Sequence, residues 1–318
     1  MSQTPAAPHN PKLSIVTGAG PVGWSVAEAL AAAGTHVRVL TRSASGPDHP
    51  LIEKVATDVS DPAQLAAAFE GAGTVFHCIH ASAYTAKAWA AQLPQTEQTV
   101  MDAAAAADAV VVFPESLYSY NQSNTVMTED GPRAAQGGKR GIRTELLKAR
   151  TAHPANTVSV VAGDFFGPRV KVAHAGDRMV PRILAGKALN PLGSADQPHS
   201  FTYVPDLAAA MVAVANRPEL WNTVLHAPTG PALTQRELAK AFASAAGVPL
   251  PTLRVIPGWM VRSGGLVSTD LREIGELLYQ FTKPFVMDSS RSEALLGFKA
   301  TAFPDAAAAT VAWWKSAA

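Results

Sequence analysis

The chain has 318 residues, of which 47% are hydrophobic and 16% charged, and its 26 Lys and Arg nearly balance its 25 Asp and Glu. This composition is typical of a globular protein with two domains, or one large unit with an appendage, and it excludes wholesale disorder. A net charge of +1 supplies no basic excess for neutralising phosphates, so we expect no nucleic-acid partner.

The sequence contains no predicted targeting or membrane-spanning segment. Residues 1–11 are rich in Pro and Ala and predict a disordered tail without the apolar core of a signal peptide. No uncharged run approaches the ~20 residues that span a membrane. We therefore expect a cytoplasmic protein with no membrane partner. The single cysteine, Cys78, makes no internal disulfide, and the scattered histidines predict no metal site.

The first half of the chain alternates short apolar runs with Ala-rich helical stretches. Strands are predicted at 13–17, 36–40, 54–57, 74–77, 110–113 and 158–161, and helices at 22–33, 62–70, 87–106 and 143–150. This β–α order predicts the α/β class, with a doubly wound parallel sheet of the Rossmann type over residues 12–170.

The second half loses this rhythm. Residues 200–226 are predicted to return to the sheet domain, with a helix at 206–214. Residues 171–199 and 227–318 are predicted to form a smaller, mainly helical C-terminal lobe that binds the substrate. Helices are predicted there at 235–246, at 270–279 and at the C-terminal end. No motif in the lobe identifies the substrate.

The first strand runs into a glycine-rich turn, TGAGPVG, which contains the pattern GxGxxG. Such a turn needs its first glycine for a tight bend, its second for close approach of a pyrophosphate, and its third for packing of helix on strand. The helix N-terminus then directs partial positive charge at the phosphates. The pattern predicts a dinucleotide site that includes Gly18, Gly20, Pro21, Val22 and Gly23.

The end of the second strand indicates which dinucleotide is bound. A carboxylate there would bind the ribose 2′-hydroxyl of NAD, but the chain has Thr41, Arg42 and Ser43 instead. Arg42 and Thr41 are suited to a 2′-phosphate, so we favour NADP over NAD. The alternative is that Arg42 is a solvated surface arginine.

Several further segments follow in a fixed order: Asp58-Val59, VFHCIHA at 75–81, FPESLYSYN at 113–121, AGDFFGP at 162–168 and HSFTYVPDLAAAM at 199–211. Together they resemble the extended short-chain dehydrogenase/reductases, the NAD(P)-dependent epimerase/dehydratase superfamily, over residues 12–315. The glycine turn is one residue shorter than that family's usual TGxxGxxG. The resemblance implies that cofactor contacts are made by Asp58, Val59, Cys78, Ile79, His80, Gly163 and Phe165.

The resemblance fails at the family's catalytic pair. That chemistry uses a Ser or Thr with the Tyr and Lys of a YxxxK motif, in which the phenol moves a proton while hydride is transferred. Glu145 matches the family's helical Glu beyond this motif, and counting back puts Gly141 at the lysine and Gly137 at the tyrosine. The chain therefore resembles an atypical member that retains only Ser116.

Nearby residues are candidates to replace the missing tyrosine. Tyr118 is the better substitute acid, whereas Tyr120 matches an ordinary loop tyrosine of the family and implies packing. His80 stands where the family has a small residue, and it either titrates near neutral pH or is a core histidine with one satisfied nitrogen. The candidate catalytic residues are therefore Ser116, Tyr118 and His80.

Other polar and aromatic side chains near this region have two interpretations each. Glu115 could serve as an acid or base. The three cations beside the lost pair could neutralise an oxyanion, but each is more simply interpreted as a solvated charge at the start of a helix. Cys78 is interpreted as inert core, and a pair of side chains is expected to line the substrate side. The three cations are Lys139, Arg140 and Arg143. The pair on the substrate side is His199 and Tyr203.

Three functions remain open at this point. The favoured one is NADP-dependent reduction of a carbonyl on a small molecule. The second is a non-catalytic NADP-binding regulator, whose nicotinamide face could be blocked by a side chain such as Phe165. A sugar-nucleotide epimerase or dehydratase is least favoured, because its internal redox cycle needs the missing pair. Helices 87–106 and 143–150 predict a homodimer.

Overall fold

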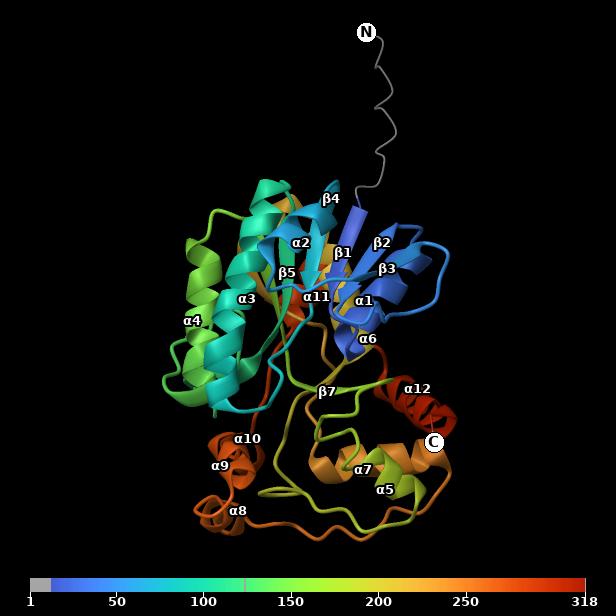
Figure 1. Cartoon of the computed structure of the whole chain (residues 1–318). Helices are drawn as coiled ribbons and strands as arrows, with labels where there is room; N and C mark the ends of the chain where they lie inside the picture. Colours follow the sequence, from blue (N-terminus) through green and yellow to red (C-terminus); the bar gives the residue numbers. More distant parts are fainter. Residues whose placement is uncertain (1–12, 123, 318) are drawn as a thin grey trace.

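A computed structural model describes residues 13–122 and 124–317, so the predicted tail lies outside the described residues (Figure 1). Seven parallel strands form one sheet in the order β3-β2-β1-β4-β5-β6-β9. This order confirms the predicted doubly wound α/β fold. The strands are β1 (Leu13–Thr17), β2 (Val37–Thr41), β3 (Ile52–Ala56), β4 (Ala72–His77), β5 (Val110–Ser116), β6 (Thr157–Ala162) and β9 (Thr223–His226).

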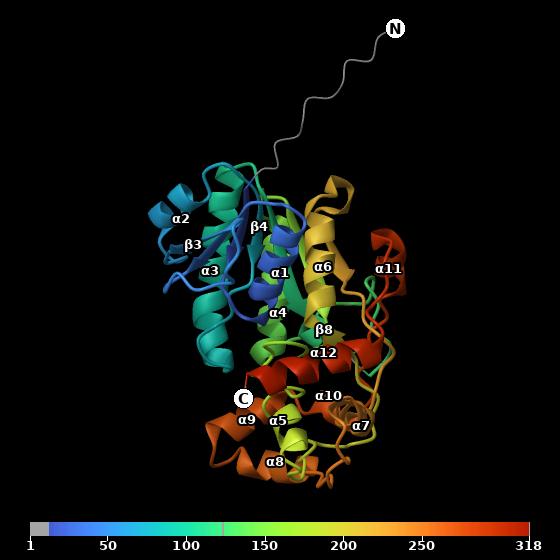
Figure 2. The same cartoon turned by 90° about the vertical axis from the view of Figure 1, so that its right-hand side faces the viewer.

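Helices cover both faces of the sheet, which is why its central strands are continuously apolar. On β5, Val110 and Val112 pack in one core cluster, and Val111 and Phe113 pack in the other. The first cluster lies under two helices that are side by side in Figure 2, α1 (Pro21–Ala32) and α6 (Val204–Ala215). The opposite face carries α2 (Pro62–Ala68), α3 (Ala86–Ala106) and α4 (Gly138–Ala152).

The start of α4 differs from the prediction, because the helix begins at Gly138 and not at residue 143. A pair of glycines disfavours a helix, so the local sequence predicts none at this point. In the structure Gly137 and Gly138 have φ of +72° and +50°. The Glu276 carboxylate accepts a hydrogen bond from the backbone N–H of Lys139 at 2.6 Å. A residue from the lobe therefore caps this helix, which no local pattern in the sequence reveals.

Two further regions differ from the prediction, the edge strands of the sheet and the helical segment at 270–279 in the lobe. β3 begins at Ile52, two residues before the predicted strand, and the edge strand β9 was not predicted. The predicted helix at 270–279 is two helices, α9 (Thr269–Glu276) and α10 (Tyr279–Thr282). Both differences lie where tertiary pairing, and not local periodicity, decides the structure.

The lobe is mainly helical, as predicted, and lies beyond the carboxyl edge of the sheet (Figures 1 and 2). Short parallel strands β7 (Asp164–Phe166) and β8 (Phe201–Tyr203) join it to the core. The two strands approach so closely that a Cβ on Gly163 would lie 2.2 Å from the Ser200 carbonyl oxygen. The lobe helices are α5 (Val180–Leu184), α7 (Gln235–Ala246), α8 (Gly258–Gly264), α9, α10 and α12 (Phe303–Ser316).

After α10 the chain returns to the core, where α11 (Ser290–Leu296) packs against α6. Within residues 13–122 and 124–317, every helix is too short or too polar to cross a membrane.

Candidate active site

The glycine turn between β1 and α1 has the geometry of a phosphate-binding loop. Gly18 has φ of +88°, and a Cβ on Gly23 would lie 2.0 Å from the Gly18 carbonyl oxygen, so both positions require glycine. A Cβ on Gly20 would meet no atom within 4 Å. Pro21 opens the helix, and Val22 anchors it in the core. The residues present therefore fit a dinucleotide, with free space above Gly20 at the helix N-terminus.

The end of β2 presents one cation beside this turn. Thr41 accepts a hydrogen bond from the Ser45 backbone at 2.8 Å, and Ser43 donates one to the Ser45 hydroxyl, so both hydroxyls serve the loop. Arg42 is exposed and forms no ion pair with any described residue. Hydrogen bonds from Ser60, and more weakly the charge of Arg42, hold the pKa of Asp58 below its usual value.

The residues after β4 and β6 gather around the same turn. The Ile79 side chain packs beside Gly18, where its Cγ1 would lie 2.9 Å from a Cβ. Burial raises the pKa of the Cys78 thiol, which is consistent with an inert side chain. Phe165 is half-buried against the core cluster that also contacts Cys78. Val59 is buried under α2, and Gly163 donates its N–H to Thr202 at 2.8 Å.

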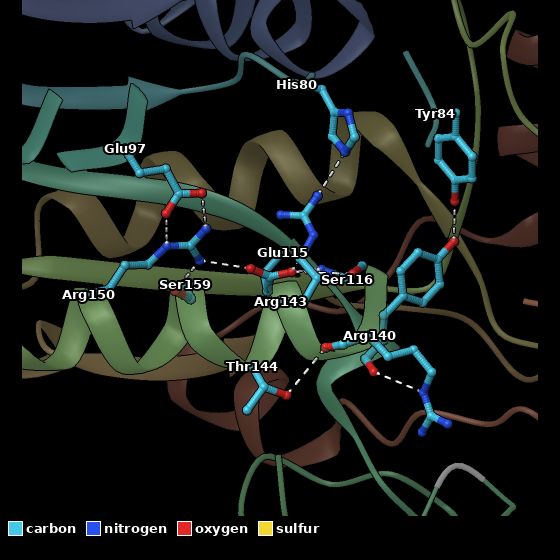
Figure 3. A network of polar contacts seen from close by, with 11 residues as sticks. His80, Tyr84, Glu97, Glu115, Ser116, Arg140, Arg143, Thr144, Arg150 and Ser159 are labelled. Carbon is cyan, nitrogen blue, oxygen red and sulfur yellow. Dashed lines mark hydrogen bonds and ion pairs between the residues drawn. The ribbon is translucent and has the colours of Figure 1, made fainter. Parts of the chain in front are cut away.

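A chain of buried charges runs beneath the site and links α3, α4 and β5 (Figure 3). Arg150 donates to both carboxylate oxygens of Glu97 at 2.7 Å and to Glu115 at 2.9 Å. The other Glu115 oxygen accepts the Ser116 N–H at 2.7 Å and lies 3.4 Å from Arg143 Nε. Glu115 is therefore held as an ion-pair partner of two arginines. The interpretation of Arg143 as a solvated charge is wrong, because its residue is only 7% exposed.

The chain of charges ends at His80. The Arg143 guanidinium lies 2.9 Å from His80 Nε2, and because arginine only donates, Nε2 must accept and the ring is neutral. Partial desolvation of the ring lowers the pKa of His80 to about 4, and the charge of Arg143 is the second cause of this shift. The contact with Arg143 favours a neutral ring with one satisfied nitrogen over a group that titrates near neutral pH, but His80 is exposed and is therefore not the core histidine of the second interpretation.

Two tyrosine hydroxyls meet on the substrate side of Ser116. The Tyr118 hydroxyl is 2.7 Å from that of Tyr84, which is labelled at the right of Figure 3. Tyr118 is buried, whereas Tyr84 is half-exposed. Burial raises the pKa of the Tyr118 phenol well above its usual value, so this hydroxyl carries a proton at neutral pH. Tyr120 bonds His226 at 2.7 Å, in agreement with a packing role.

Tyr84 was missed by the sequence analysis. It lies seven residues after the end of β4, in a loop of Ala and Ser, and no family motif includes it. The only signal was an aromatic residue in an otherwise small and polar loop. Its partner Tyr118 was found because it follows Ser116 directly on the chain.

The two positions that lack the family's pair lie at the start of α4, under a helix of the lobe. A Cβ on Gly138, the residue after Gly137, would lie 2.2 Å from the Glu276 Oε1 of α9. A Cβ on Gly141 would lie 3.2 Å from the Gln136 backbone. The α9 carboxylate therefore lies beside Gly138, whereas a Cβ on Gly137, the position of the tyrosine in relatives with the motif, would meet no atom within 4 Å.

The cations beside these positions also form ion pairs or hydrogen bonds. Lys139 is fully buried and pairs with Glu273 and with Glu276, the latter at 3.1 Å, and its Nζ lies 5.3 Å above the Tyr84 ring. Arg140 donates to the Tyr120 carbonyl at 2.6 Å. The interpretation of Lys139 as a solvated charge is wrong, because Lys139 is buried and its ion pairs with Glu273 and Glu276 join the lobe to the core.

The pair expected on the substrate side lies in the seam between core and lobe. His199 is buried, and its Nε2 is 3.2 Å from the Asp164 carboxylate. Tyr203 is half-buried beside a cavity of about 10 Å³, which holds about one water molecule. Asp164 also adds to the raised pKa of Tyr118 and Tyr279, for each of which burial is the larger cause.

The fold and the glycine turn define an extended short-chain dehydrogenase/reductase. The chain belongs to the NAD dependent epimerase/dehydratase family, whose model matches residues 14–223. This confirms the resemblance seen in the sequence, although Gly137 and Gly141 stand where the family has its YxxxK pair and the chain's one YxxxK, from Tyr279 to Lys283, lies in the lobe.

Solved structures share the fold. The Bordetella bronchiseptica enzyme WbmG in complex with NAD is 22% identical with a TM-score of 0.74, and the match covers 98% of this chain and 96% of that chain. The Thermus thermophilus UDP-glucose 4-epimerase complex with NAD is 19% identical with a TM-score of 0.75, over 96% and 100%. The Thermotoga maritima UDP-glucose 4-epimerase with UDP-glucose is 17% identical with a TM-score of 0.74, over the same shares. Curated proteins give no match.

The state of His80 is testable by NMR titration. We expect its ring signals, assigned by their loss in His80→Gln, to titrate with a midpoint of about 4. Arg143→Gln should raise this midpoint, because it removes the cation that opposes protonation. Since the folded pKa lies below that of the unfolded chain, His80 should cost stability as the pH falls from about 6.5 towards 4. A midpoint near the ordinary value in the wild type would contradict the assignment of a neutral ring.

Proposed function

We propose that this chain is a nicotinamide-dinucleotide-dependent oxidoreductase that reduces a carbonyl group on a small molecule. The observation that carries the proposal is the glycine turn, with Gly18 and Gly23 held in their required geometry and free space above Gly20. Membership of the epimerase/dehydratase family supports the same cofactor class. The adenosine end of the dinucleotide would lie between the end of β2 and Asp58.

We further propose that NADP is preferred over NAD. Arg42 is an exposed cation at the end of β2, and neither neighbour in Thr41-Arg42-Ser43 is a carboxylate. An arginine there suits a 2′-phosphate, whereas the ribose 2′-hydroxyl of NAD is usually held by an acidic residue. Several similar solved structures contain NAD, which supports the other choice. The preference therefore needs a direct measurement.

The proton for carbonyl reduction would come from Tyr118. The dinucleotide, when bound, supplies the hydride. Tyr118 is protonated at neutral pH and can donate but not accept a proton, and its raised pKa makes it a weaker acid than a tyrosine beside a lysine. The Tyr84 hydroxyl at 2.7 Å is half-exposed and would return a proton from solvent to Tyr118. Ser116, whose backbone is held by Glu115, would orient the carbonyl oxygen by a hydrogen bond.

A second candidate is a dinucleotide-binding regulator without turnover. The observation that favours a regulator is the contact of α9 with α4. Glu276 lies beside Gly138, next to the position that lacks the tyrosine, and two carboxylates neutralise Lys139. A protein that has lost the pair and holds the start of α4 in this way needs no catalytic proton. A sugar-nucleotide epimerase is supported only by similar structures with UDP-glucose, and the glycines at the family's YxxxK position, Gly137 and Gly141, weigh against it.

Calorimetry with NADPH and NADH tests the cofactor proposal. We expect NADPH to bind more tightly, and Arg42→Ala to weaken NADPH binding by roughly tenfold to a hundredfold, since a charge-assisted contact contributes about 1.5–3 kcal/mol. NADH binding should not change. Arg38→Ala, which removes an arginine on the same strand that is paired with Glu53, is the matched control and should affect neither. Failure of both dinucleotides to bind would contradict the proposed function and the regulator together.

Turnover tests the role of Tyr118. In a screen of aldehydes and ketones for NADPH oxidation, Tyr118→Phe should lower kcat by about 10²–10⁴-fold, because a positioned acid contributes that much, and should leave NADPH affinity unchanged. Tyr84→Phe should lower kcat less. Tyr120→Phe is the control, since it removes a buried hydroxyl that packs on His226 outside the site. If no carbonyl is reduced while NADPH binds tightly, the regulator becomes the better account.

A further inference from the structure

The end of the lobe farthest from the sheet exposes large apolar side chains. This lobe tip consists of α8 and the turn after it, residues 265–268, and both views place α8 at the far end of the molecule from the sheet (Figures 1 and 2). Trp259 is 66% exposed, Met260 49%, Leu266 84% and Val267 90%. So much large apolar surface in one short segment indicates a contact with something outside the chain.

These side chains share one face of a continuous helical turn. Trp259 and Leu266 are seven residues apart, as are Met260 and Val267, and seven residues make two helical turns. Backbone hydrogen bonds of 3.2 Å from Leu266 to Ser263 and from Val267 to Gly264 extend the turn beyond α8. Val261 lies on the opposite face and is buried with Leu278 and Phe281. The inner face is anchored, so the outer face is presented in a fixed arrangement.

Two segments beside the lobe tip carry cations and no carboxylate, whereas α9, which packs against α8, begins with the exposed Asp270. Residues 178–195 and 238–269 contain no Asp or Glu, although the chain as a whole has 25. The two segments lie side by side, because Leu189 pairs with Leu253 and Leu192 with Ile256. Their cations form no ion pair with any described residue. These are Arg178, Arg182, Lys187, Lys240, Arg254 and Arg262.

We propose that the lobe tip docks on an anionic lipid surface. Trp259, Met260, Leu266 and Val267 enter the headgroup region, while unpaired cations such as Arg254 and Arg262 face the anionic headgroups. Apolar side chains flanked by cations, with no acidic residue among them, are the composition of interfacial membrane contacts. This differs from our expectation of no membrane partner, which rested on spanning segments that a peripheral contact does not need.

The charge distribution decides between a membrane and a second copy of the chain. In a symmetric dimer through the lobe tip, Arg254 and Arg262 of one copy would face the same patch on the other. No carboxylate in these two segments is available to neutralise them. An anionic surface supplies the missing counter-charge to every cation at once.

Vesicle sedimentation of the full chain tests the proposal. We expect binding to vesicles of phosphatidylcholine with phosphatidylglycerol, and little binding to phosphatidylcholine alone. Trp259→Ser with Leu266→Ser should abolish binding, and each of Arg254→Ser and Arg262→Ser should weaken it roughly fivefold. Val126→Ser, which changes an exposed valine outside the lobe tip, is the matched control and should bind like the wild type. All of these side chains are exposed, so the variants should keep the thermal stability of the wild type.

Three results would overturn the proposal. They are failure to bind anionic vesicles, equal binding to both kinds of vesicle, and equal binding by Trp259→Ser/Leu266→Ser and the wild type. A concentration-dependent dimer that is lost only in Trp259→Ser/Leu266→Ser would assign the lobe tip to a second copy instead. None of these measurements depends on dinucleotide binding, so they stand or fall separately from the proposed function.

Discussion

The structure depends on one buried arginine between two carboxylates. Arg150 on α4 binds Glu97 on α3 and Glu115 on β5, donates to Ser159 on β6 at 3.0 Å, and lies 4.1 Å above the Phe113 ring. Taking these charges out of water is costly, and the pairing offsets that cost only while every member is present. Because Glu115 also holds the Ser116 N–H, the same contact fixes the start of the loop that carries Tyr118. The candidate acid is thus positioned from the core outward.

A second set of charges positions the site from the lobe inward. Glu273 and Glu276 of α9 cap the N-termini of α3 and α4 and neutralise the buried Lys139. Helix N-termini favour nearby carboxylates, so α9 is held by the two helix ends as well as by the lysine. These contacts lie beside the place where the family's tyrosine and lysine are missing, although a Cβ on Gly137 would meet no atom within 4 Å. The start of α4 is therefore held by the lobe, and the hydroxyls of Tyr84 and Tyr118 form a pair on the neighbouring loops.

Local patterns predicted the parts of the fold that local forces decide. The sheet, its covering helices and the glycine turn follow from apolar runs, helix caps and the special backbone of Gly18. Asp61, for example, accepts hydrogen bonds from the first turn of α2, as its position before Pro62 predicts. The extended start of α4 could not be predicted, because its cap comes from Glu276 in the lobe.

The candidate site was predictable to the extent that its residues are adjacent in sequence. Ser116 and Tyr118 share one segment, but Tyr84 reaches Tyr118 only through the tertiary fold. The buried roles of Lys139 and Arg143 were missed for a similar reason, since each depends on carboxylates far away in the chain. A charged residue in a continuously apolar strand, as Glu115 is in β5, was the one local sign that a buried partner exists.

Equilibrium unfolding of Arg150→Ala tests most directly whether this buried arginine organises the structure. The account predicts a loss of about 3–5 kcal/mol in the free energy of unfolding, because Glu97 and Glu115 would stay buried without their shared partner. Lys148→Ala, which breaks an exposed pair on the same helix, should change it by less than about 0.5 kcal/mol. A loss of similar size in both variants would contradict the account, since it would show that the buried charges hold neither the helices nor the loop of Tyr118.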